Sequence, residues 1–241
     1  MAMKGYVHSF ESLAAVDGDG LRCAVFLSGC PIRCIYCHNP DTWDISSGNE
    51  ISPRDLVKKI ARYKTYFGKD GGVTFSGGEP LMQAEFIKEL IPLLENEGIG
   101  YIIDTSGTVE LTETVKEVLR CSQSVLLDIK FWDKQSYKKY SGADMDFVLK
   151  TLEYLETIGK KTVVRTVVVP GINDSIEILN KYVALIKDYV CIAKYELLGF
   201  HTMGFFKYDN MGIVNRLLNV PALTPERKSE LQIFVNNELK K

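Results

Sequence analysis

Residues 29–40 read Gly29-Cys30-Pro31-Ile32-Arg33-Cys34-Ile35-Tyr36-Cys37-His38-Asn39-Pro40. Three cysteines lie within eight residues of this stretch, directly after the apolar run 23–27, which predicts a buried strand. A strand that ends in such a loop can bring three thiolates to one inorganic centre. An ordinary iron–sulfur cluster takes four cysteines. The other three cysteines of this chain are scattered in apolar strand or helix surroundings, where we expect buried thiols: Cys23, Cys121 and Cys191. The spacing therefore predicts a cluster with one iron left open for a substrate or cofactor.

Two other interpretations of the triplet stay open on these residues alone. His38 could complete a zinc site as the fourth ligand, because soft thiolate sets bind zinc as well as iron–sulfur clusters. The cysteines could also be buried thiols that hold no metal.

The composition indicates an ordinary globular protein. A length of 241 residues fits one α/β domain, and 46% hydrophobic with 25% charged residues is usual for a protein with a proper core. The net charge of −2 gives no reason to expect a nucleic-acid or membrane partner. The sequence lacks an apolar run of membrane-spanning length, and residues 1–6 lack the apolar core of a signal peptide. We therefore expect a cytoplasmic protein, in which six cysteines indicate metal or redox chemistry.

Strand-like and helix-like patterns alternate along the chain, which predicts parallel βαβ units. Apolar or β-branched runs predict strands, and three- to four-residue apolar spacing predicts helices. The expected strands are 21–27, 72–75, 99–103, 125–129, 162–169 and 191–198. The expected helices are 52–67, 86–98, 112–119, 146–158, 176–186 and one that begins near 224. Six such units predict an α/β fold, an open partial TIM-type (βα)6 barrel, in a single domain over residues 1–241.

Unusual residues follow most of these expected strands. Ligands bind at the carboxyl ends of parallel strands, so we expect these residues to share one site. The groups are Cys30–His38, Ser76–Glu79, Asp104–Gly107, Asp128–Lys130, Arg165 and His201. Strand alternation predicts that Asp128 and Lys130 point to one face. Arg165 in a buried strand needs an anionic or hydrogen-bonding partner, either a ligand or a neighbouring carboxylate.

The cysteine spacing, together with Tyr36 and the later Gly77-Gly78-Glu79, resembles the radical S-adenosylmethionine (SAM) enzymes. The run from Cys34 to Asp44, with residues 8–12 upstream, is most similar to the activating enzymes of glycyl radical enzymes. Many relatives carry an inserted ferredoxin-like segment with further cysteines, whereas this chain has none between Cys37 and Cys121. The resemblance, which runs from about His8 to the C-terminus, therefore favours pyruvate formate-lyase as the substrate.

The resemblance also implies a role for each matching residue. Cys30, Cys34 and Cys37 would hold a [4Fe-4S] cluster, and Asp17 would be catalytic, although Asp19 stands where the family usually has proline. Asp104, Thr105 and Asp128 would bind a monovalent cation, Na⁺ or K⁺. The residues expected to contact SAM are Tyr36, Cys37, His38, Gly77, Gly78, Glu79, Asp104, Asp128, Ile129, Lys130, Arg165 and His201.

The implied reaction is the activation of a partner protein. An electron from a low-potential donor, such as flavodoxin or ferredoxin, would pass through the cluster and cleave SAM reductively. The adenosyl radical would then take a hydrogen from the Cα of a glycine in the partner. Two alternatives are a radical SAM enzyme that acts on a small molecule and a non-catalytic, zinc-stabilised protein.

Overall fold

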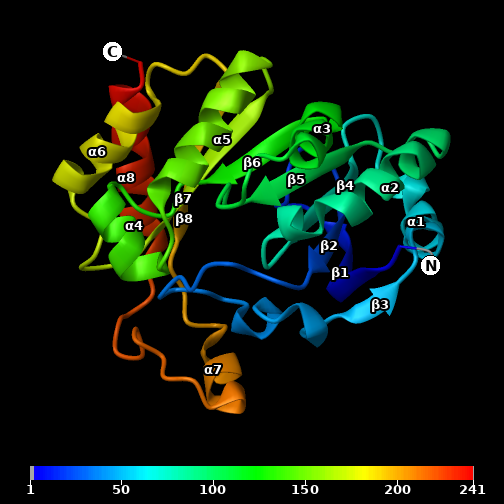
Figure 1. Cartoon of the computed structure of the whole chain (residues 1–241). Coiled ribbons are helices and arrows are strands. Elements are labelled where there is room, and N and C mark those ends of the chain that lie inside the picture. Colours follow the sequence, from blue (N-terminus) through cyan, green and yellow to red (C-terminus); the bar gives the residue numbers. More distant parts are fainter. Residues whose placement is uncertain (1–2, 241) are drawn as a thin grey trace. The chain divides into compact units, whose positions relative to one another are not determined.

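The computed structural model describes residues 3–240 and divides the chain into two compact units (Figure 1). The first unit contains residues 3–31, 41–105 and 109–126, and the second contains residues 32–40, 106–108 and 127–240. The chain passes from one unit to the other inside the cysteine stretch, after Pro31. The single domain over residues 1–241 stays a prediction.

The first unit is built on a sheet in which β2, β4 and β5 run parallel. The strand order is β3-β1-β2-β4-β5, followed by the first residues of β6, and β1 pairs antiparallel with both β2 and β3. We did not predict β1 or β3, because β1 is rich in polar residues and β3 is very short. The strands are β1 (Gly5–Ala14), β2 (Arg22–Leu27), β3 (Asn49–Ile51), β4 (Gly72–Gly77), β5 (Tyr101–Thr105) and β6 (Ser124–Asp128).

Three helices follow the strands of this unit, and α2 packs against both α1 and α3. Ser52 and Thr112 cap α1 and α3 by accepting bonds from the N–H groups of Asp55 and Val115. The expected helix 52–67 is shorter than predicted, since α1 ends at Ala61 and a 3-10 turn follows it. The helices are α1 (Pro53–Ala61), α2 (Ala84–Asn96) and α3 (Glu113–Cys121), with 3-10 turns η1 (Pro40–Thr42), η2 (Ile45–Ser47), η3 (Lys64–Tyr66) and η4 (Pro80–Gln83).

The second unit contains the end of β6, then β7 (Thr162–Val168) and β8 (Ile192–Gly199), which pair in parallel. Helices α4 and α7 were not predicted, because each is short and α4 is strongly polar. Tyr137 of α4 and Tyr208 of α7 are nevertheless buried. The helices are α4 (Lys134–Ser141), α5 (Met145–Thr157), α6 (Ile176–Ile186), α7 (Phe205–Met211) and α8 (Pro225–Glu238).

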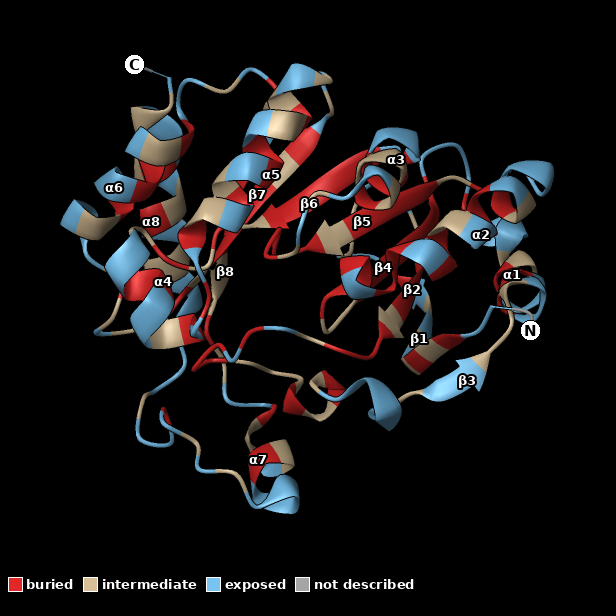
Figure 2. Cartoon of the chain, in the orientation of Figure 1, coloured by how far each residue is buried: buried red, intermediate tan, exposed pale blue. Residues whose placement is uncertain are grey.

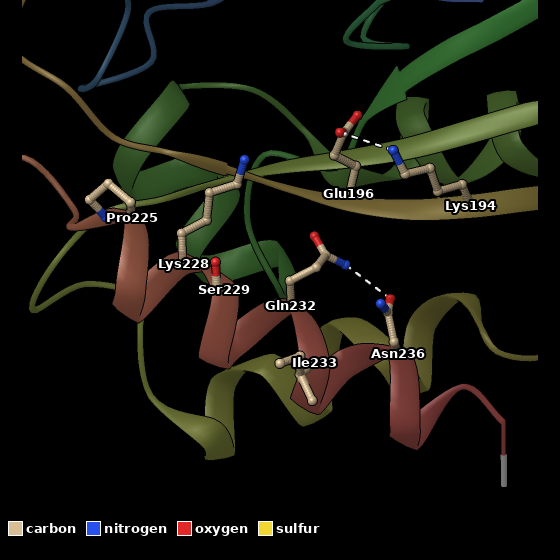
Figure 3. A pocket seen from close by; sticks show the side chains of 8 residues that line it. All are labelled: Lys194, Glu196, Pro225, Lys228, Ser229, Gln232, Ile233 and Asn236. Atoms are coloured by element: carbon tan, nitrogen blue, oxygen red, sulfur yellow. Dashed lines mark hydrogen bonds and ion pairs between the residues drawn. The ribbon is translucent and has the colours of Figure 1, made fainter.

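Strand β8 is the outer strand of the second unit, and helix α8 covers part of its free edge (Figure 3). The side-chain amide of Gln232 accepts from the N–H of Leu197 at 2.8 Å and donates to the carbonyl of Tyr195 at 2.9 Å. It thereby replaces the peptide group of a neighbouring strand, which protects an edge that could otherwise pair with another chain.

Buried residues concentrate in the strands, whereas the outer faces of the helices are exposed (Figure 2). In β2 and β4 almost every residue is buried, as expected for strands covered on both faces. No helix within residues 3–240 has the length and apolar composition needed to cross a bilayer. The predicted α/β class with a mostly parallel sheet is confirmed.

Candidate active site

Cys30 stands at the end of β2, where the Ser76–Glu79 turn holds its backbone in place. The N–H of Glu79 donates to the carbonyl of Gly29 at 2.8 Å, and the N–H of Cys30 donates to the carbonyl of Trp43 at 3.1 Å. A Cβ on Gly78 would lie 2.3 Å from the Gly29 oxygen, so only glycine permits this approach. The two-glycine turn, which we predicted to admit a ligand, therefore also positions the first cysteine.

Gly77 ends β4 with φ at +115°, a conformation that glycine adopts without strain. A Cβ there would lie 2.4 Å from the backbone of Leu27 on β2. The first glycine of the turn is thus required by the packing of two adjacent strands.

The predicted oxygen donors of the first unit meet at the ends of β4 and β5. Glu79 is fully buried and accepts a hydrogen bond of 2.7 Å from the hydroxyl of Thr105 and one of 3.1 Å from the N–H of Leu81. The hydroxyl of Ser76 donates to Asp104 at 2.7 Å. The structure therefore brings Glu79, Asp104 and Thr105 to one edge of the sheet, as the sequence predicted.

Asp17 lies in the loop before β2. A buried arginine fixes the position of this loop. The carbonyl of Asp17 accepts from the Thr74 hydroxyl at 2.6 Å, and that hydroxyl also accepts from Nε of Arg22 at 2.9 Å. Arg22 is fully buried and also donates to the carbonyls of Asp19, Asp70 and Val73.

Burial lowers the pKa of Arg22 to about 10, opposed by the carboxylates of Asp19 and Asp17. Sequence reasoning missed this residue, although an arginine at the start of an apolar strand beside a glycine-rich acidic loop was a usable signal. Arg22 is the residue that fixes the loop that carries Asp17.

Cys34 and Cys37 lie in the second unit, in a loop fastened to the C-terminal end of α4. The N–H of Ile35 donates to the carbonyl of Tyr140 at 2.9 Å, and the N–H of Cys37 donates to the carbonyl of Cys34 at 3.1 Å. The Tyr36 ring lies 5.6 Å from that of Phe131, and its hydroxyl donates to the Lys130 carbonyl at 3.3 Å. The tyrosine of the motif thus connects the cysteine loop to the segment after β6.

Asp128, Lys130 and Arg165 form a nearly buried ion triad. Nε of Arg165 donates to one oxygen of Asp128 at 2.9 Å, and Nζ of Lys130 donates to the other at 2.7 Å. Burial tends to raise the pKa of Asp128, but Arg165 and Lys130 lower it more, so the carboxylate is charged at neutral pH.

Strand alternation correctly predicted that Asp128 and Lys130 lie on one face. Ile129 between them is buried, and its backbone pairs with β7 through the carbonyl of Arg165 and the hydroxyl of Thr166. The partner of Arg165, which we left open between SAM and a carboxylate, is Asp128 in this structure.

His38 and His201 stack face to face, with ring centroids 3.8 Å apart. Nε2 of His38 lies 2.9 Å from the His201 carbonyl and must be protonated, since a carbonyl only accepts. Burial, with the neighbouring cationic groups, lowers the pKa of His38 to about 4, and burial also lowers that of His201. Nδ1 of His201 is buried without a hydrogen-bond partner. Both imidazoles are therefore neutral, and Nδ1 of His201 is available to bond a ligand.

The remaining cysteines were expected to be buried. Cys23 and Cys191 are buried, and burial raises the pKa of each thiol to about 11. Cys121 is exposed at the end of α3, so its predicted burial was wrong, because it lies with Arg120 on the solvent side of a last turn whose other side buries Val118 and Leu119.

Two further features of the described residues bear on the site, their metal-binding side chains and a surface hollow. Among residues 3–240, no three histidine, cysteine, aspartate or glutamate side chains could together hold one metal ion. A hollow of about 640 Å³ lies between β8 and α8 and is lined by none of the predicted site residues (Figure 3). Its lining is Lys194, Glu196, Pro225, Lys228, Ser229, Gln232, Ile233 and Asn236.

Comparison with known proteins supports the chemistry that these residues suggest. Residues 25–182 match the model of the radical SAM superfamily. The chain is 40% identical over 236 residues to a pyruvate formate-lyase-activating enzyme of Clostridium pasteurianum, covering 98% of both chains. It is 38% identical to the enzyme of the same name from Staphylococcus epidermidis, covering 97% of this chain and 96% of the other. This chain belongs to the radical SAM superfamily and, within it, to the pyruvate formate-lyase-activating enzymes.

Solved structures agree on the fold at low sequence identity. Streptococcus suis SuiB, bound to its precursor peptide SuiA, has a TM-score of 0.71 at 18% identity, covering 97% of this chain, which spans about half (48%) of that protein. A domain of a pyruvate formate-lyase-activating enzyme from Bacteroides vulgatus has a TM-score of 0.56 at 20% identity, covering 69% of this chain and 94% of that one.

The residues present fit the cofactors that the superfamily implies, a [4Fe-4S] cluster and SAM. Three thiols in one loop are the donors that an iron–sulfur cluster prefers. The unpartnered Nδ1 of His201 stands beside the loop that carries two of them, where a polar ligand would satisfy it.

Proposed function

We propose that this chain activates pyruvate formate-lyase by removing a hydrogen atom from the Cα of one glycine in that protein. The observation that carries this proposal is the end-to-end match, 40% identical over 98% of both chains, to a relative with this activity in its name. The relatives described above carry neither of the two alternatives raised by the sequence, a small-molecule radical enzyme and a zinc-stabilised protein, in their names.

The cluster and SAM, once bound, supply the one-electron cleavage of SAM and the abstraction of the hydrogen atom. Cys30, Cys34 and Cys37 would hold the cluster. Glu79 and Lys130 would orient the methionine end of SAM, since one offers carboxylate oxygens and the other an ammonium group. His38 and His201, both neutral, would border the adenosine end.

Asp17 is assigned to the partner's glycine segment. Its loop is held on the β2 side, where the Thr74 hydroxyl donates to the carbonyl of Asp17 and Arg22 donates to the carbonyl of Asp19. A glycine Cα buried in a folded enzyme cannot reach this chain, so the segment must leave its own fold and bind as an extended peptide.

Turnover with an isotopically marked glycine tests the proposal. Anaerobically reconstituted, reduced protein is mixed with SAM and pyruvate formate-lyase deuterated at glycine Cα. We expect an organic radical signal in the partner and transfer of deuterium into 5′-deoxyadenosine. A short peptide with the glycine sequence should react at higher concentration, because each 1.4 kcal/mol of lost contact costs about tenfold in affinity. Robust SAM cleavage without deuterium transfer from protein or peptide would refute the mechanism.

The reductant is proposed to be a low-potential carrier, flavodoxin or ferredoxin, in the cytoplasm. The cytoplasm suits the chemistry because thiols stay reduced there. Reduced flavodoxin and reduced ferredoxin can be compared with a chemical reductant. A carrier that supports no turnover under conditions where the chemical reductant does is excluded.

A monovalent cation, Na⁺ or K⁺, is proposed to bind Asp104, Thr105 and Asp128. Oxygen donors suit hard cations, and Asp104 and Thr105 are adjacent at the end of β5. SAM affinity measured in Na⁺, K⁺ and choline chloride at equal ionic strength tests this assignment. Equal affinity in all three salts would contradict it.

A further inference from the structure

The segment 201–208 lies against residues 37–39 of the cysteine stretch, all within the second unit. The hydroxyl of Tyr208 donates to the carbonyl of Cys37 at 2.8 Å, and Nζ of Lys207 donates to Oδ1 of Asn39 at 2.8 Å. Nε2 of His38 donates to the carbonyl of His201 at 2.9 Å. Three consecutive residues of the stretch are therefore each bonded to one distant segment.

Gly204 brings the two backbones into direct contact. A Cβ at this position would lie 2.6 Å from the carbonyl oxygen of His38, so a side chain would force the two segments apart. The segment has no room to shift toward the cysteine loop. The cysteine loop therefore sets the position of segment 201–208.

Helix α7 (orange in Figure 1) gains little burial of its own from this arrangement. Tyr208 is its one buried residue, whereas Phe206 is 59% and Met211 is 42% exposed. Phe205 is half-buried against Phe200, with ring centroids 6.0 Å apart, so core packing holds this helix only at its first residue and at Tyr208. The helix is held in place by Tyr208, whose hydroxyl donates to the carbonyl of Cys37.

That hydrogen bond completes the restraint on the Cys37 backbone. The N–H of Cys37 already donates to the carbonyl of Cys34 at 3.1 Å, and its carbonyl accepts from Tyr208. With both peptide groups bonded, the thiol can change direction only by rotating about its side-chain bond.

We propose that Tyr208 is a positioning residue, whose hydroxyl holds the carbonyl of Cys37 and so aims the third cysteine of the motif at the cluster. This rests on the proposed function only in that Cys37 holds the cluster. Tyr208 contacts neither SAM nor the partner in this role. Its effect passes through the backbone of one ligand.

The test uses Tyr208→Phe, which keeps the buried ring and removes only the hydroxyl. Tyr195→Phe is the matched control, because Tyr195 is equally buried in the same unit and donates one bond, at 3.2 Å, to Thr166. In cluster-loaded protein without SAM or partner, we measure iron release to a chelator and the spectrum of the reduced cluster. We expect Tyr208→Phe to release iron roughly five- to tenfold faster, as for one lost hydrogen bond, with an altered spectrum. Tyr195→Phe should release iron at the wild-type rate, even if its unfolding midpoint falls as much as that of Tyr208→Phe.

A second measurement uses iron-free protein, so the result does not depend on activity. The alkylation rate of Cys37 and the amide exchange of residues 37–39 should both rise in Tyr208→Phe and not in Tyr195→Phe. Wild-type iron release and exchange in Tyr208→Phe would overturn the proposal, as would equal iron loss in the two variants. If wild-type protein took up no cluster, the proposed function would fail, while the iron-free measurements would still decide the role of Tyr208.

Discussion

The replacement Asp128→Asn tests the ion triad of the second unit. It keeps the shape of the side chain and removes its negative charge. Lys130 and Arg165 would then lose the counter-ion that they share, with side chains only 16% and 11% exposed. Each charge-assisted bond to Asp128 contributes about 1.5–3 kcal/mol, and breaking a buried pair costs roughly 3–5 kcal/mol.

We expect a loss near the lower end of that range, about 3 kcal/mol, because asparagine still accepts one bond. For a chain of this length that loss lowers the thermal midpoint by roughly 6–12 °C. Thermal and urea unfolding of iron-free protein measure it. Asp146→Asn is the control, since its pair with Lys134 is exposed, with side chains 46% and 67% accessible, and should matter far less.

The pH dependence of the stability difference between wild type and Asp128→Asn tests the direction of this effect. The folded pKa of Asp128 is lowered, so its stabilisation is complete above the unfolded value of about 3.9 and is lost as the pH falls through the folded value. Wild type and Asp128→Asn should therefore differ fully at pH 5–8 and converge below about pH 4. Equal losses in Asp128→Asn and Asp146→Asn, or a gap that does not narrow in acid, would refute the reasoning.

Three further predictions concern the cluster, SAM and the sheet edge. Replacing any one of the three motif cysteines with alanine should abolish SAM cleavage, whereas Cys121→Ala should keep its iron; iron loss there would contradict the three-ligand assignment. Lys130→Ala should weaken SAM binding by roughly 1.5–3 kcal/mol in iron-replete protein, measured by calorimetry, and unchanged affinity would remove its assigned role. Gln232→Ala should leave two backbone groups of β8 unpaired, cost about 1–3 kcal/mol and promote self-association on gel filtration. Asn236→Ala, which removes only a neighbouring bond to Gln232, should stay monodisperse if this account of the edge is correct.

The strand–helix alternation was predictable because apolar and β-branched runs are local signals. The run 162–169 corresponds to β7, and Ser52 and Thr112 cap helices where expected. The missed elements are those whose stability comes from tertiary contacts. Helix α7 is short and mostly exposed, and it forms where Tyr208 reaches a residue 171 positions earlier. No local pattern carries that information.

The sequence by itself indicated the chemistry of this protein, since the spacing of three cysteines favoured an iron–sulfur cluster and, with the Gly-Gly-Glu turn, carried the family resemblance that implied SAM. It also determined that Asp128 and Lys130 share a face, because strands alternate with a period of two. Only the tertiary structure decided which partners those residues take. Arg22 bonds the Thr74 hydroxyl that holds the Asp17 loop, Asp128 neutralises Arg165, and Tyr208 holds Cys37. The members of each pair lie far apart in the sequence, at separations that no local periodicity encodes. The physical reason is that a buried charge or hydroxyl must find a partner, while the identity of that partner depends on which backbone the fold brings near.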